Sequence, residues 1–120
     1  MDAATTTLLD MADLRGHFAG RADLLRRVIK IFDEQTPELL ARLRHAFRRG
    51  DAQTVEYAAH TLKGSLAQLG AQITAGLAEQ LEHAARVAAP GRSEAVLKEL
   101  ETQAAQLRRL LNNLANSPDV

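Results

Sequence analysis

Residues 58–71 contain a histidine, a lysine and a glycine at helical spacing. On an α-helix with about 100° per residue, His60, Lys63, Gly64 and Ala67 lie within one quadrant. The opposite side of the same helix is apolar and consists of Ala59, Leu62, Leu66 and Leu69. The segment therefore predicts an exposed imidazole one helical turn from an ammonium group, on a helix with a buried apolar stripe.

These residue types suit the capture of a phosphoryl group. A neutral imidazole is a nucleophile, and an unperturbed pKa of about 6.5 leaves such a side chain mostly unprotonated at cellular pH. An ammonium group one turn away attracts phosphoryl oxygens and offsets their charge. Gly64 destabilises a helix interior by about 1 kcal/mol relative to alanine, and we expect it to allow another protein close to His60. The plainer interpretation is that His60 is an ordinary polar surface residue.

The histidines do not form a metal-binding pattern. Di-iron helical bundles use Glu-x-x-His, which places a carboxylate and an imidazole one turn apart. The residues three positions before His17, His45, His60 and His83 are Leu14, Arg42, Tyr57 and Gln80. His-Glu-x-x-His is absent as well, and a chain without cysteine forms no thiolate metal site and no disulfide.

Neither nucleotide chemistry nor general nucleic-acid binding is indicated. The seven glycines form no phosphate-binding loop, and Lys63-Gly64-Ser65 reverses the Gly-Lys order of that motif. Fifteen basic and fifteen acidic residues give zero formal charge, whereas nucleic-acid affinity depends on excess lysine and arginine. One local cluster is basic, namely Arg42, Arg44, His45, Arg48 and Arg49. We interpret it as a solvated face near a helix C-terminus, with contact to an acidic partner as the alternative.

The candidate residues must be positioned by helices, because the composition favours helix along the whole chain. The 120 residues are 46% hydrophobic, mostly alanine and leucine, and only 3% aromatic. Apolar residues recur at spacings of three and four in four long segments. One segment runs over about residues 21–49 across Pro37, which predicts a single kinked helix. The other three stripes cover 55–69, 73–88 and 97–114, and a short helix is expected at 10–18, closed by Gly20.

Short connections between these segments predict an all-α fold, an antiparallel up-down four-helix bundle with an additional short N-terminal helix. Turns are expected at Gly50 and Gly70, with Asp51 and Ser93 as helix caps. In the helix over 73–88 we expect the core-facing residues to be Ile73, Leu77, Leu81, Ala84 and Ala88. The length predicts a single domain over 1–120, with a structured core at about 8–115.

The sequence also bears on where the protein resides. No apolar run approaches the roughly 18 residues of a membrane span, and the first ten residues lack the layout of a signal peptide. We therefore expect a cytoplasmic protein without membrane insertion, and we expect it to be monomeric.

One sequence signature extends outward from His60. It is the run Ala59-His60-Thr61-Leu62-Lys63-Gly64-Ser65, followed by Leu69-Gly70-Ala71 and Leu81-Glu82. This signature resembles that of histidine-containing phosphotransfer (HPt) domains of bacterial two-component phosphorelays. The resemblance extends over about residues 8–115 and includes Thr36-Pro37-Glu38-Leu39-Leu40 and Gly50-Asp51 before the motif. Leu66 stands where the family frequently has a small residue.

The resemblance implies a histidine phosphotransfer protein of a multistep phosphorelay. His60 would accept a phosphoryl group from a receiver-domain phosphoaspartate and pass it to another receiver domain, with a hybrid sensor histidine kinase as a further partner. Lys63 would assist electrostatically and Gly64 would permit close docking. Six more residues are implied near the site. Ser65 and Gln68 would form hydrogen bonds there, and the docking residues would be Thr61, Ala67, Gln80 and His83.

The same resemblance implies what the chain does not carry itself. It would bind no cofactor, and magnesium would belong to the partner receiver domain. The protein would be a phosphoryl carrier without kinase or nucleotide-hydrolysing activity of its own. Whether such a carrier is classed as an enzyme stays open. No acidic residue lies between positions 57 and 78, so we expect the surroundings of His60 to favour a phosphoryl group.

Two other hypotheses remain. The first is a non-phosphorylated helical adaptor that binds a kinase or a receiver, and a buried, internally bonded His60 would favour it. The second is a metal-binding bundle, which requires two or more histidine or carboxylate side chains that converge inside the protein.

Overall fold

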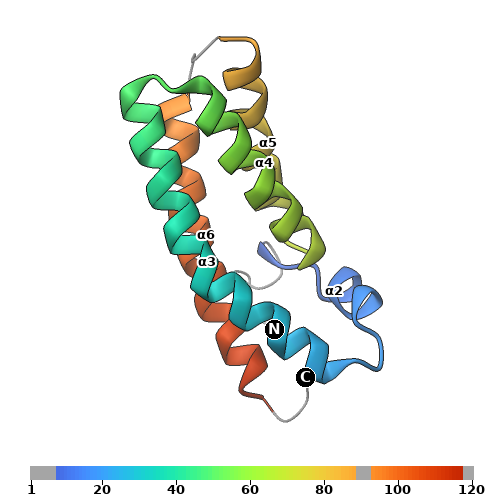
Figure 1. The fold of residues 1–120 in the computed structure, drawn as a ribbon. Coiled ribbons are helices and arrows are strands. Elements are labelled where there is room, and N and C mark those ends of the chain that lie inside the picture. Colours follow the sequence, from blue (N-terminus) through green and yellow to red (C-terminus); the bar gives the residue numbers. More distant parts are fainter. Residues whose placement is uncertain (1–7, 89–92, 118–120) are drawn as a thin grey trace.

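The computed structural model describes residues 8–88 and 93–117, and these residues form helices joined by turns, without a strand (Figure 1). The helices are α2 (Met11–His17), α3 (Ala22–Arg49), α4 (Ala52–Gln68), α5 (Gln72–Arg86) and α6 (Ser93–Ala115). In Figure 1, α3 to α6 run alternately up and down, and α2 lies at the end of the bundle where α4 passes into α5. The predicted all-α, antiparallel four-helix bundle with a short N-terminal helix is confirmed.

Helix α3 is continuous across Pro37, as the unbroken apolar phase predicted. It ends at Gly50, whose φ of 72° is the left-handed conformation that glycine adopts at low cost. Asp51 then begins α4, and its carboxylate accepts hydrogen bonds from the backbone N–H of Thr54 at 3.2 Å and from the Thr54 hydroxyl at 2.7 Å. The expected turn and cap at these two residues are therefore present.

The turn between α4 and α5 is held by the N-terminal segment. Gly70 has φ of 76°, and a Cβ atom there would lie 2.8 Å from the backbone oxygen of Asp10. The N–H of Asp10 donates to the Gly70 carbonyl at 2.8 Å, and the Asp10 side chain accepts from the N–H of Asp13 to cap α2. Glycine is required here both by its backbone angle and by this close approach.

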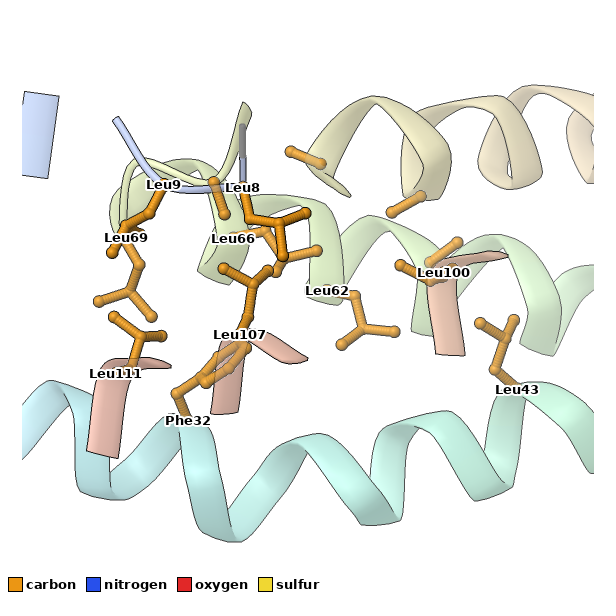
Figure 2. Packing of buried hydrophobic residues seen from close by; sticks show 14 of the residues in the cluster. Leu8, Leu9, Phe32, Leu43, Leu62, Leu66, Leu69, Leu100, Leu107 and Leu111 are labelled. Carbon is orange, nitrogen blue, oxygen red and sulfur yellow. The ribbon is translucent and has the colours of Figure 1, made fainter. Parts of the chain in front are cut away.

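The core lies between all four long helices, and it fixes which face of α4 points outward. Leu62 and Leu66 of α4 are each 1% exposed. Figure 2 shows them with Leu69 on one side of α4, facing Phe32 of α3 and the α6 leucines. Burying such side chains contributes about 1.5–3 kcal/mol each. This packing directs the opposite face of α4, which carries His60, to solvent.

The predicted core face of α5 is confirmed at Leu81, which is buried, and is wrong at its two ends. Ile73 is 52% exposed and Ala88 is also exposed, whereas the buried residues of α5 are Thr74, Ala75, Ala78, Leu81 and Glu82. Two polar residues occupy this face because each has partners inside the bundle. The Thr74 hydroxyl donates to the side-chain oxygen of Gln103 at 2.7 Å, and Glu82 is surrounded by cationic groups. The apolar residues alone therefore predicted a core face that is rotated about the helix axis, away from the side of Leu81 on which Thr74 and Glu82 lie.

One residue of the basic cluster on α3 is not part of a solvated face. Arg44 forms what we call the α3–α6 tie with Glu94 and Glu101. Its guanidinium donates to Glu101 at 3.1 and 2.6 Å and to both carboxylate oxygens of Glu94 at 2.8 Å. The side chain of Arg44 is 17% exposed, whereas Arg42, His45, Arg48 and Arg49 are exposed as predicted.

The remaining expectations on topology concern the turn after α5 and the membrane. Ser93 is the first residue of α6, and the predicted turn at 90–92 lies outside the described residues. Within the described residues, no helix combines the length and the apolarity that a membrane crossing requires.

Candidate functional site

His60 lies on the outer face of α4, near its middle. Its side chain is 66% exposed, as the helical phase predicted. The preceding residues, Ala58 and Ala59, are fully buried, and their small side chains let α4 pack closely on its neighbours. The backbone under His60 is therefore anchored while its imidazole remains open to another protein.

A buried acid from the next helix holds this imidazole. Glu82 of α5 is 4% exposed, and its Oε2 atom lies 2.7 Å from Nδ1 of His60. Its other carboxylate oxygen, Oε1, lies 2.8 Å from Nζ of Lys63. The sequence-based reasoning missed Glu82, although it follows Leu81 in the recognised motif. The expectation for the surroundings of His60 rested on the absence of acidic residues between positions 57 and 78, whereas an acid 22 residues after His60 in the chain lies against the imidazole.

The contact with Glu82 decides which nitrogen of His60 is free. An ionised carboxylate only accepts hydrogen bonds, so Nδ1 must carry the hydrogen. In the neutral ring the lone pair then lies on Nε2, on the exposed side chain. The hydrogen bond of Lys63 lowers the pKa of Glu82, helped by the hydrogen bond of His60, while burial acts in the opposite direction. Glu82 is thus ionised at neutral pH, and it orients the ring with Nε2 as the nucleophilic atom.

Arg86 completes what we call the site cluster, made of His60, Lys63, Glu82 and Arg86. Its Nη2 atom lies 2.9 Å from Oε2 of Glu82, the oxygen that also bonds His60. Its Nε atom lies 3.5 Å from a carboxylate oxygen of Glu56, one turn before His60 on α4. A polar hollow borders the cluster, lined by Lys63, Glu79, Gln80, Glu82, His83 and Arg86. Gln80 and His83, both implied as docking residues, are exposed on α5 at this hollow.

The hydroxyl residues implied near the site bond within their own helix. The Ser65 hydroxyl donates to the backbone oxygen of Thr61 at 3.3 Å, and the Thr61 hydroxyl donates to the backbone oxygen of Tyr57 at 3.0 Å. Ser65 also lines a hollow between α3 and α4, away from the α5 side where Glu82 lies. The structure therefore brings Lys63 to the imidazole through Glu82, and it does not bring Ser65 there.

The part of the α4 surface that Gly64, Ala67 and Gln68 form beside His60 is uncharged and open. Gly64 is exposed, and a Cβ atom built on it would meet nothing within 4 Å. Neither packing inside this chain nor a positive φ explains the glycine. Its presence agrees with the expectation that another protein approaches the helix closely at this position. Gln68 is exposed and Ala67 partly buried on the same face. Tyr57 adds an exposed aromatic ring to it, 64% exposed, which the sequence-based reasoning did not assign.

The metal hypothesis finds no support in the described part of the chain. There, no group of three or more His, Cys, Asp or Glu side chains is placed to hold a metal ion. The carboxylate nearest to His60 is already bonded to Lys63 and Arg86, two cationic groups that would repel a metal ion.

The fold and the site define a class of protein, a helical bundle that presents a histidine oriented by a buried acid. A model of the Hpt domain family matches residues 27–117, and the chain belongs to this family. The resemblance inferred from the sequence is thereby confirmed, as is its link to histidine phosphotransfer in phosphorelays.

A solved relative shows the same architecture. The crystal structure of histidine-containing phosphotransfer protein B (HptB) from Pseudomonas aeruginosa PAO1 matches with a TM-score of 0.84 and 29% sequence identity. The match covers 90% of this chain and 94% of that chain. No curated protein matches the chain.

Proposed function

We propose that His60 accepts a phosphoryl group on Nε2 from the phosphoaspartate of a receiver domain and passes it to the aspartate of another receiver domain. One observation carries the proposal, the exposed imidazole whose Nδ1 is bonded to the buried Glu82. It supports a neutral ring with an outward lone pair, as in-line attack on phosphorus requires. The direction of net flow depends on the two partners.

The transfer needs no proton to move at the reacting atom. The Nε2 lone pair forms the bond to phosphorus, the bond from phosphorus to the aspartate oxygen breaks, and its electron pair stays on the aspartate carboxylate. The phosphorylated ring keeps its hydrogen on Nδ1 and carries positive charge, which Glu82 balances at 2.7 Å. In the second transfer the acceptor carboxylate attacks phosphorus, and the electron pair of the N–P bond returns to Nε2.

Lys63 and Gly64 support this reaction in different ways. The Lys63 side chain is 30% exposed, so its ammonium group can turn from Glu82 to the oxygens of an arriving phosphoryl group. Gly64 leaves room for the receiver beside the imidazole. Thr61, Ala67 and Gln68 extend the docking face along α4. Magnesium, in this proposal, is held by the receiver, where it neutralises the phosphoaspartate.

The test is transfer of radioactive phosphate from a phosphorylated receiver domain to the purified protein. We expect labelling that is stable to base and labile to acid, and we expect no labelling of His60→Gln. Labelling that persists in His60→Gln would contradict the assignment of the nucleophile. A wild-type protein that binds the receiver without becoming labelled would instead support the adaptor hypothesis.

A further inference from the structure

Resting on the proposed function, we infer that Arg86 is a positioning residue, which holds Glu82 in place against His60 while Lys63 turns to the phosphoryl group. The two carboxylate oxygens of Glu82 have different partners. Oε1 is bonded to Lys63, and Oε2 is bonded to both His60 and Arg86. Arg86 therefore acts on the oxygen that orients the imidazole.

Arg86 is itself held from two helices. It lies one turn after Glu82 on α5, and its Nε atom reaches Glu56 of α4 at 3.5 Å. Glu56 in turn lies one turn before His60. The arginine thus links α4 and α5 at the hollow that borders the site cluster. A guanidinium suits this position, because its fixed fork of donors contacts two carboxylates at once.

Two cations facing one buried carboxylate allow a division of roles. If Lys63 alone balanced Glu82, its turn toward the phosphoryl group would leave a buried, uncompensated negative charge beside His60. Such a charge favours the protonated imidazole, which has no lone pair on Nε2. Arg86 has no need to move, because its Nη2 already lies 2.9 Å from Glu82. It keeps Glu82 balanced while Lys63 turns away, so the attacking ring stays correctly oriented and keeps its lone pair on Nε2.

Other charged groups near the carboxylate come from the same two helices. Among the residues lining the hollow, α5 contributes Glu79 and His83 besides Arg86, and α4 contributes Lys63. The side chains of Arg86 and Glu56 are 55% and 39% exposed, so their ion pair is screened by water and adds little to the stability of the bundle. A loss of function on replacing Arg86 is therefore separable from a loss of folding.

The experiment compares initial rates of phosphoryl transfer from one phosphorylated receiver between pH 5.5 and 9. We expect Arg86→Gln to lower the rate at pH 7 roughly three-fold and to move the midpoint of the pH–rate profile up by roughly 0.5 pH unit. Arg86→Lys should restore most of both losses. Arg109→Gln, an exposed arginine on α6 outside the site cluster, is the matched control and should leave the profile unchanged.

A second comparison isolates the division of roles. In a Lys63→Ala background, Arg86→Gln should lower the rate by more than it does alone, roughly ten-fold, because neither cation is left at Glu82. A profile of Arg86→Gln that overlays the wild type, or a rate lowered equally at every pH, overturns the inference while the proposed function stands. A wild-type protein that takes up no phosphate contradicts the proposed function and this inference with it.

Discussion

Two charged clusters join helices in this bundle, and they are built in opposite ways. In the α3–α6 tie, a mostly buried arginine, Arg44, lies between Glu94 and Glu101. In the site cluster, a buried acid, Glu82, lies between cationic groups from α4 and α5. Both clusters cross-link two helices by charge-assisted hydrogen bonds, at 2.6 and 2.8 Å in the α3–α6 tie and at 2.8 Å between Lys63 and Glu82 in the site cluster.

The two clusters differ in whether one of their polar atoms remains free to react. The guanidinium of Arg44 meets carboxylate oxygens on both sides, and the hydrogen bonds of Glu101 and then Glu94 raise its pKa, so its charge is fully committed. In the site cluster, His60 uses Nδ1 inward and keeps Nε2 on a side chain that is 66% exposed. A cluster whose polar atoms are all satisfied contributes to stability, whereas one that leaves a nucleophilic atom at the surface is suited to chemistry.

Replacing Glu82 should have the largest effect on transfer. In Glu82→Ala the imidazole loses its partner at 2.7 Å, so both its tautomer and its orientation become mixed. We expect the rate of transfer from a phosphorylated receiver to fall on the order of 10²-fold. Glu82→Gln, whose side-chain oxygen still accepts a hydrogen bond from Nδ1, should lose less. Equal rates in the alanine variant and the wild type would remove Glu82 from the mechanism.

Replacing Arg44 should affect stability rather than transfer. Arg44→Ala removes hydrogen bonds to two carboxylates, and we expect it to lower the free energy of unfolding by about 1–2 kcal/mol. The partly exposed Glu94 and Glu101 can hydrate, which limits the loss. Urea unfolding measures the first effect, and phosphotransfer in the absence of urea measures the second. A transfer rate reduced as much as in Glu82→Ala would erase the distinction between the two clusters.

Replacing Lys63 should slow transfer without unfolding the protein. Lys63→Ala removes the cation nearest to the phosphoryl group, and we expect a rate about ten-fold lower, which corresponds to about 1.4 kcal/mol. The helical circular dichroism and the melting temperature should stay near those of the wild type, because the side chain is partly exposed. Unchanged kinetics would show that Lys63 serves only to balance Glu82.

The smallest effect concerns stability in acid. The pKa of Glu82 in the folded protein lies below its ordinary value of 4.5, so the native state binds fewer protons than the unfolded state in that range. The stabilisation by Glu82 is fully present above about pH 4.5 and is lost as the pH falls through the lower folded value. We expect the difference in unfolding free energy between wild type and Glu82→Gln to shrink on acidification from pH 6 to 3. A difference that stays constant with pH contradicts the ionised state of Glu82.

The two clusters also show how far the sequence alone leads. Helical phase within one segment placed His60 outside, with Gly64 on the same exposed face, because neighbours on one helix are fixed by residue spacing. Contacts between helices are fixed by packing, which the sequence does not display. The phase of α5 was misjudged because Glu82 and Thr74 are buried polar residues, each satisfied from another helix. Arg44 was assigned to the solvent for the same reason, since its partners lie 50 and 57 residues away.

The central claim, that Nε2 of His60 receives the phosphoryl group, is tested most directly by nuclear magnetic resonance of the phosphorylated protein. Protein labelled with nitrogen-15 and phosphorylated by a receiver domain should show coupling of phosphorus to the Nε2 atom of His60, with the hydrogen kept on Nδ1. Phosphorus bonded to Nδ1, or to a residue other than His60, would contradict the account built on the contact between His60 and Glu82.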